Sequence, residues 1–265
     1  TALGKSKPII FFSEAWIKAA AKTASYFCVS EGSVMATLTP SIVMENIATL
    51  SIKARMGVKP GTLGKHISVL QDSERERLSS YRSIIREEFA RKKSVFICLP
   101  TNEDIRVALS AFEKGIEDYT YIFYPNMKKS ELRSAWKEAC LNPHPILIIA
   151  SAQWLLFPRS DFGTIILDRE NASGWRTLAR PFIDMRVFVE FIAEESGIRL
   201  IIGDSALRIE TLYRYKSEEL SGIEPVKFRL TAPAGPGSSS RGAIVSMKDD
   251  NKKAGFAAVS AKLLS

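Results

Sequence analysis

The stretch from residue 161 to residue 213, DFGTIILDRENASGWRTLARPFIDMRVFVEFIAEESGIRLIIGDSALRIETLY, decides which fold the sequence predicts. Two short apolar runs, at 164–167 and 198–202, flank a segment whose apolar residues follow helical spacing across 187–192. The stretch therefore predicts a strand, a loop, a helix, a second strand and a second helix. The first run ends on Asp168, and the carboxyl end of a buried strand is where open α/β sheets place ligand chemistry. We expect functional side chains near this residue.

Similar units precede this stretch. Apolar runs at 95–99, 121–124 and 146–149 alternate with segments of helical spacing within 78–85, 105–112 and 132–140. Strands that alternate with helices of this length predict a parallel sheet with helices on both faces. Ahead of these units, Ser13 is expected to cap a helix that buries Trp16, and a second short helix is expected between Gly32 and Pro40. We therefore predict an α/β fold preceded by a small helical segment.

Composition narrows the class of protein and of partner. The chain has 265 residues, a net charge of +8 and a pI near 9.4, which favour a polyanionic partner, although an ordinary basic soluble protein fits the charge equally well. Its three cysteines, Cys28, Cys98 and Cys140, form no C-x-x-C pair, so neither a disulfide framework nor a metal site is predicted. No apolar run is long enough to span a membrane. We expect a cytoplasmic protein with no membrane partner.

Three groups of residues carry a resemblance to a known family. Asp168-Arg169-Glu170-Asn171 is followed by Gly203-Asp204-Ser205-Ala206 and then by Glu210-Thr211-Leu212. These groups fall where the primosomal protein N′ (PriA) family of superfamily 2 DNA helicases has Asp-Glu-Glu-His, Gly-Ser-Ala-Thr and Glu-Thr-Leu. The sequence resembles that family without a gap from Ile149 to Leu212. The resemblance implies a RecA-like lobe of the P-loop NTPase type.

The resemblance also implies where the residues of ATP hydrolysis should lie, and most are replaced. Asp168 holds the position of the Mg²⁺-binding aspartate, but Arg169 replaces the glutamate that activates water, and an arginine cannot accept a proton. Glu170 holds the third position of the same box. Asp168 and Glu170 are thus the only catalytic candidates, and neither is assigned a role. A cap or turn at a strand end is the alternative interpretation of Asp168.

The phosphate loop implied by the resemblance is degenerate as well. The family's T-G-S-G-K-T falls on residues 73–78, SERERL, where no glycine remains and two carboxylates have appeared. Ser73 and Arg77 are the remaining candidates for nucleotide contact, and Arg77 is interpreted as a solvated cation on a helix. The GTLGKH run at 61–66 departs from the P-loop pattern and is interpreted as a turn. The family uses ATP-Mg and zinc, but we expect neither cofactor to be bound by this chain.

The predicted domain organisation has three parts. Residues 1–50 resemble the helical end of the family's 3′ DNA-binding domain, 51–68 are expected to be a linker, and 69–265 are expected to be a degenerate first helicase lobe. Residues 231–242, TAPAGPGSSSRG, are typical of a flexible loop. The second lobe of the family, with its zinc-binding cysteines, is expected outside this chain.

Two functions from different classes follow. The first is a PriA-like replication-restart protein that binds single-stranded or forked DNA beside other primosome and replication proteins, without ATPase activity. The second is a diverged ATP-dependent 3′-5′ DNA helicase whose second lobe lies outside this chain. A dinucleotide-binding enzyme is a distant third, because no G-x-G-x-x-G follows a predicted strand. DNA contact is assigned to Arg91, Lys92 and Lys93, although a solvated helix surface explains these charges equally well.

Overall fold

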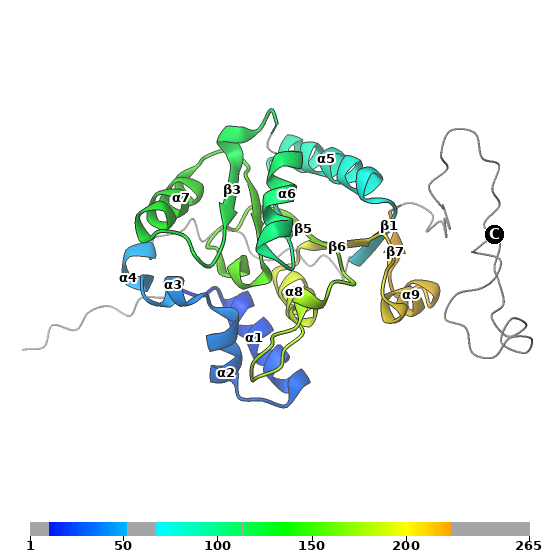
Figure 1. The fold of residues 1–265 in the computed structure, drawn as a ribbon, viewed down its shortest axis with the longest axis horizontal. Helices are drawn as coiled ribbons and strands as arrows, with labels where there is room; N and C mark the ends of the chain where they lie inside the picture. Colours follow the sequence, from blue (N-terminus) through cyan, green and yellow to red (C-terminus); the bar gives the residue numbers. More distant parts are fainter. Residues whose placement is uncertain (1–10, 52–66, 113, 224–265) are drawn as a thin grey trace, which may run out of the picture. The chain divides into compact units, whose positions relative to one another are not determined.

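The computed structural model describes residues 11–51, 67–112 and 114–223, and these form a seven-stranded sheet with helices on both faces (Figure 1). The strands lie in the order β3-β4-β2-β5-β6-β1-β7, and neighbouring strands are parallel. Their bounds are β1 Ile67–Gln71, β2 Ser94–Cys98, β3 Thr120–Phe123, β4 Leu147–Ala150, β5 Phe162–Asp168, β6 Arg199–Asp204 and β7 Ser221–Gly222. β6 lies between β1 and β5. This is the α/β, RecA-like fold class that the sequence predicts.

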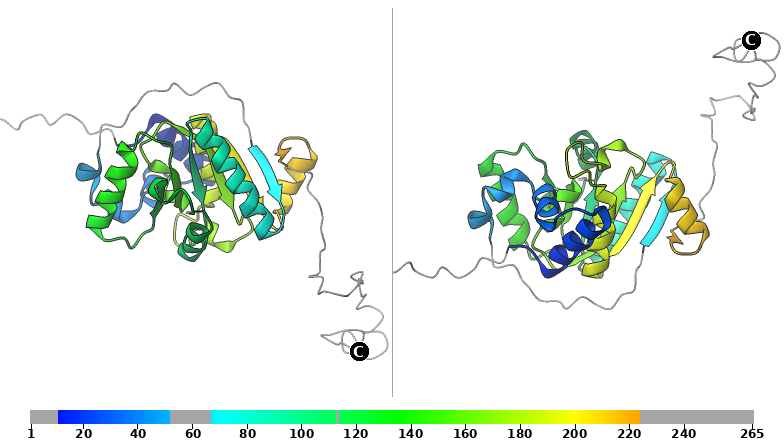
Figure 2. Two further views of the ribbon diagram at one scale, coloured as in Figure 1. Left: turned by 90° about the horizontal axis from the view of Figure 1, so that it is seen from above. Right: turned by 90° about the horizontal axis from the view of Figure 1, so that it is seen from below.

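The helices divide between the two faces of the sheet. Their bounds are α1 Glu14–Phe27, α2 Glu31–Leu38, α3 Ser41–Met44, α4 Ile47–Leu50, α5 Glu74–Ala90, α6 Asn102–Phe112, α7 Lys129–Leu141, α8 Met185–Ser196 and α9 Ile209–Lys216, with 3-10 turns η1 Glu117–Tyr119, η2 Ala152–Leu156 and η3 Ser173–Trp175. α5 and α6 bury their apolar side chains against one face, while α1, α7 and α8 share a core with the other. α5 lies in front in the view from above, and α1 in the view from below (Figure 2).

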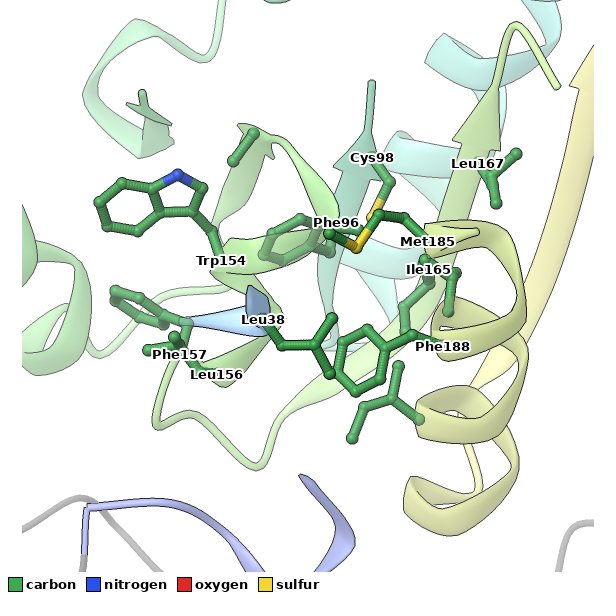
Figure 3. Close-up of a cluster of buried hydrophobic side chains, with 14 of the residues drawn as sticks. Leu38, Phe96, Cys98, Trp154, Leu156, Phe157, Ile165, Leu167, Met185 and Phe188 are labelled. Carbon is green, nitrogen blue, oxygen red and sulfur yellow. The ribbon is translucent and has the colours of Figure 1, made fainter. Parts of the chain in front are cut away.

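The larger core joins the helical segment to the sheet. Figure 3 shows Leu38 of α2 beside Phe188 of α8, with Phe96 of β2 in the same cluster. Trp16 of α1 is fully buried, as predicted, and its ring contacts that of Phe188 at 6.0 Å between centroids. Burying an aromatic side chain such as Phe188 contributes about 1.5–3 kcal/mol. The helical segment and the sheet are therefore held by one shared apolar interior.

Local signals in the sequence set several helix ends. The Ser13 hydroxyl accepts a hydrogen bond from the Trp16 amide at 3.1 Å, so Ser13 caps α1 as predicted. α8 begins after Asp184, whose carboxylate accepts from the Arg186 amide. It ends at Gly197, which adopts a left-handed conformation (φ 63°) that glycine tolerates without strain.

Two strands were not predicted. β1 begins at Ile67, where the sequence suggested only a bridge, and β7 contains two residues, too few for a periodicity signal. β1 becomes a strand because β6 and β7 supply its backbone partners from more than a hundred residues away. The predicted turn at 61–66, the flexible loop 231–242 and most of the predicted linker lie outside the described residues. Of the helices in the described ranges, none is both long and apolar enough to cross a membrane.

Candidate functional site

The carboxyl ends of three neighbouring strands bring the predicted site residues together. β5 ends on Asp168 and β6 on Asp204, and β1 leads through Asp72 into α5. Because these strands are parallel, their last residues lie at the same edge of the sheet. The two candidates for nucleotide contact, Ser73 and Arg77, lie in the turn and first helical residues after β1. The resemblance therefore placed four site positions that the fold does bring to one edge.

Asp168 is held in a buried ion pair. Arg77 Nε donates to Asp168 Oδ1 at 2.8 Å and Arg77 Nη2 donates to Oδ2 at 3.3 Å. The Tyr81 hydroxyl donates to Oδ1 at 2.7 Å. The three residues are 6%, 2% and 0% exposed for Asp168, Arg77 and Tyr81. Burial, and then the nearby Asp168 charge, raises the pKa of Tyr81, so the phenol keeps the proton that it donates.

The interpretation of Arg77 as a solvated helix cation is wrong. In addition to Asp168, its Nη1 donates to the Asp72 carbonyl at 2.9 Å and to the Ser205 hydroxyl at 2.8 Å. Arg77 thus joins the ends of β1, β5 and β6. The sequence pattern missed this role because its main partner lies 91 residues away. The signal that was available is the i, i+4 spacing of Arg77 and Tyr81, which places both on the helix face that meets Asp168.

Gly203 makes room for this cluster. A β-carbon at position 203 would lie 1.7 Å from the Tyr81 hydroxyl oxygen and 3.1 Å from Asp168 Oδ1. The glycine that the family resemblance identified is therefore needed here for the close approach of Tyr81. Asp204 follows it, and its carboxylate accepts from the amides of Ser205 at 2.6 Å and Asn171 at 2.7 Å. These contacts fix the turn after β6 against the turn after β5.

The start of α5 does not fit a nucleotide. A helix N-terminus binds phosphate when its amides and dipole are free to face the anion. Here the Ser73 hydroxyl accepts from the Glu76 amide at 3.4 Å, and Glu74 and Glu76 place two carboxylates in the first turn. Arg77 holds both oxygens of the only aspartate that would meet Mg²⁺. The described residues contain no group of three metal-ligating side chains. ATP-Mg therefore does not fit the residues present.

Arg169 is turned to a different partner. It adopts a left-handed conformation (φ 60°), and its guanidinium forms an ion pair with Asp104 in the first turn of α6. Thr101 accepts from the Asp104 amide at 3.2 Å and donates to its carboxylate at 2.6 Å. The Arg169 carbonyl accepts from the Trp175 indole at 2.8 Å. Arg169 thus stabilises the start of α6, and it offers no proton acceptor to a reaction at Asp168.

Glu170 is a buried anchor. It is 3% exposed, its carboxylate accepts from the Thr211 hydroxyl and from the Arg208 amide at 2.9 Å, and its carbonyl accepts from Arg186. Burial raises the pKa of Glu170 above its ordinary value, although the donors from Thr211 and Arg208 oppose this. Both carboxylate oxygens are used in holding α9 to the end of β5. Glu170 is therefore placed for a structural role.

A loop beyond β5 projects exposed side chains beside this edge. Between Arg176 and Asp184, which form an antiparallel bridge, Leu178 is 97% exposed and Phe182 is 63% exposed. Arg176 is also exposed, with 68% of its side chain accessible. A cleft of about 200 Å³ lies at the base of this loop, lined by Pro100, Ser151, Gln153, Gly174, Trp175 and Arg176 among others. The Ser151 hydroxyl is buried in its wall, and it has no hydrogen-bond partner within the described ranges.

The residues assigned to DNA contact lie at the opposite edge. Arg91 caps the carboxyl end of α5 and Lys93 precedes β2, so both lie where the parallel strands begin. Arg91 pairs with Glu87 at 2.6 Å, and the positive φ of Lys92 (59°) turns the chain there. The structure thus separates Arg91, Lys92 and Lys93 from Asp168 and Arg77. Whether they contact DNA stays a prediction.

Comparison with known proteins adds one distant likeness. No family model matches the chain. Among solved structures, the UvsW helicase from bacteriophage T4 is similar, at 9% sequence identity and a TM-score of 0.40, over 76% of this chain and 74% of that one. An α/β fold of helicase type is what this chain is similar to at that level.

Proposed function

We propose that this chain is a helicase-like lobe that binds DNA at stalled replication forks without hydrolysing ATP. One observation carries the proposal: the Arg77 guanidinium is bound to both oxygens of Asp168, the residue that the family resemblance assigns to Mg²⁺. A buried cation that already neutralises this carboxylate removes the charge that would attract a metal. The frame of a nucleotide-driven lobe is kept, and an internal ion pair stabilises it.

The loop between Arg176 and Asp184 supports the DNA-binding half of the proposal. Single-stranded nucleic acid is bound by aromatic side chains that stack on bases and by cations that meet phosphates. Phe182 is exposed here, and Arg176 and Arg180 lie on the same loop with exposed side chains. The buried Ser151 hydroxyl in the neighbouring cleft offers a further hydrogen bond to a phosphate or sugar oxygen. This loop and cleft form the DNA surface that we favour, with Arg91–Lys93 as a second one.

The replication-restart role rests on the sequence resemblance to the PriA family. The alternative, a diverged ATP-dependent helicase, requires a nucleotide to displace Arg77 from three partners and to approach Glu74 and Glu76. Such a displacement leaves a buried carboxylate and a buried guanidinium unpaired, which costs several kcal/mol. The non-hydrolysing function is therefore favoured.

The test combines nucleotide and DNA titrations of the purified chain. We expect no saturable rise in melting temperature with Mg-ATP, no DNA-stimulated ATPase, and binding of forked DNA that ATP leaves unchanged. The matched control is Asp168→Asn, which keeps the size of the side chain but removes its charge. A saturable Mg-ATP shift that Asp168→Asn abolishes would sink the proposal. Absence of DNA binding at low salt would remove its DNA half.

A further inference from the structure

A groove on the opposite side of the sheet from α8 is not used by the proposed function. It runs between α5 and the end of α6, has a volume of about 480 Å³, and is lined by Arg82, Ile85, Arg86, Phe89, Ser110, Ala111, Phe112, Lys114 and Ile116. This volume lies within the range of about 300–1,000 Å³ typical of ligand pockets. The groove therefore has room for several side chains of a partner.

The floor of the groove is apolar. Ile85 and Phe112 are 3% and 4% exposed, and Phe89 and Ile116 are half-buried beside them. Ile85 and Phe89 are spaced i, i+4 on α5, so they form a continuous strip along the helix. A ligand that gains from this floor must carry aliphatic or aromatic side chains. The small exposed area of Phe112 leaves little ring face for a nucleic-acid base.

The rim of the groove is cationic. Its described charged lining residues are Arg82, Arg86 and Lys114, and all three are exposed. Arg82 Nε donates to the Ala111 carbonyl at 3.0 Å, which stabilises the end of α6 and fixes the guanidinium beside the groove. Within the described ranges, neither Arg86 nor Lys114 has an ion-pair partner. A partner that supplies carboxylates would therefore meet charges that are still available.

We infer that this groove, with its apolar floor and cationic rim, docks an acidic amphipathic helix of a partner protein. Apolar residues at i, i+3, i+4 and i+7 of such a helix fit the strip of Ile85 and Phe89, and glutamates at its margins meet Arg86 and Lys114. A DNA strand satisfies the rim but leaves the floor unused. The groove belongs to α5 and α6, so it is separate from the loop at 176–184.

The probe is a fluorescent helical peptide with leucines at i, i+3, i+4 and i+7 and glutamates on both flanks, measured by anisotropy against the full chain. We expect saturable binding, which Arg86→Glu and Lys114→Glu each weaken by about tenfold or more. The matched control is Arg75→Glu, which makes the same charge change at an exposed residue of α5 outside the groove. It is expected to change the affinity by less than about twofold.

Three outcomes overturn the inference. They are no binding to the native chain, equal weakening by Arg86→Glu and Arg75→Glu, and undiminished binding of a scrambled peptide with the same composition. A test independent of surface charge is Phe89→Ala, which shortens the floor and is expected to weaken the peptide while leaving forked DNA bound. If Phe89→Ala instead weakens DNA and spares the peptide, the groove is a nucleic-acid surface and the inference fails.

Discussion

Gly203 lies directly beneath Tyr81, so close that a β-carbon at position 203 would be 1.7 Å from the Tyr81 hydroxyl oxygen. No real β-carbon tolerates such a contact, so position 203 must lack a side chain for Tyr81 to reach Asp168. The requirement comes from the far end of a helix side chain, not from the local backbone, because Gly203 lies in β6 with ordinary strand pairing.

Gly203→Ala should therefore be strongly destabilising. The added methyl forces Tyr81 away from Asp168, and overpacking of this kind costs about 1–3 kcal/mol before the lost hydrogen bond is counted. The control is Gly32→Ala in α2, where a β-carbon meets nothing within 4 Å and alanine is favoured in a helix. Thermal unfolding should show a marked fall for the first variant and no fall for the second. Equal melting temperatures would contradict the contact.

The buried pair of Arg77 and Asp168 gives a second prediction. Asp168→Ala leaves the guanidinium buried without its anion, and removing one partner of such a pair costs about 3–5 kcal/mol. Replacing both residues by apolar ones, in Arg77→Met with Asp168→Leu, should cost less than the single change. Arg106→Ala breaks an exposed pair with Glu103 and should change stability little. Denaturant unfolding measures all three, and a double variant less stable than Asp168→Ala would argue against this account.

The pH dependence of stability should report Glu170. Its folded-state pKa is raised by burial, so from its ordinary value near 4.5 upward the folded chain holds a proton that the unfolded chain has released. Stability contributed by the protonated form is therefore lost as pH rises through that window. Glu170→Gln should flatten this decline, while Glu103→Gln, at an exposed position, should leave it unchanged. Melting temperatures across the window test this, and a rising contribution from Glu170 would reverse the sign we assign.

The two candidate DNA surfaces lie at opposite edges of the sheet, so they can be tested separately. If Arg91, Lys92 and Lys93 meet phosphates, replacing all three by alanine should weaken every sequence alike. It should also reduce the salt slope by about 0.7 per lost contact on a single strand. Replacing Arg176 and Arg180 by alanine tests the loop in the same way. The variant that leaves affinity and salt slope unchanged removes its residues from the interface.

How far the sequence predicts this molecule depends on the distance between cooperating residues. The central strands, the helices between them and the Ser13 cap follow from apolar period and local hydrogen bonding, which act over a few residues. The cluster of Arg77, Tyr81 and Asp168 does not, because its hydrogen bonds join residues about ninety positions apart. Glu170 was located by the resemblance, but its use as an anchor for Thr211 depends on how α9 returns to β5.

Arg77 also changes the timescale on which the lobe can respond. A bound nucleotide arrives, reacts and leaves, and each step changes the charge that faces the strand ends. The guanidinium is part of the chain, so it has no dissociation rate and its occupancy does not depend on any concentration. A lobe built in this way keeps a single electrostatic state whether the cell is rich or poor in energy. Its grip on a partner would then be constant, where that of a motor rises and falls with each turnover.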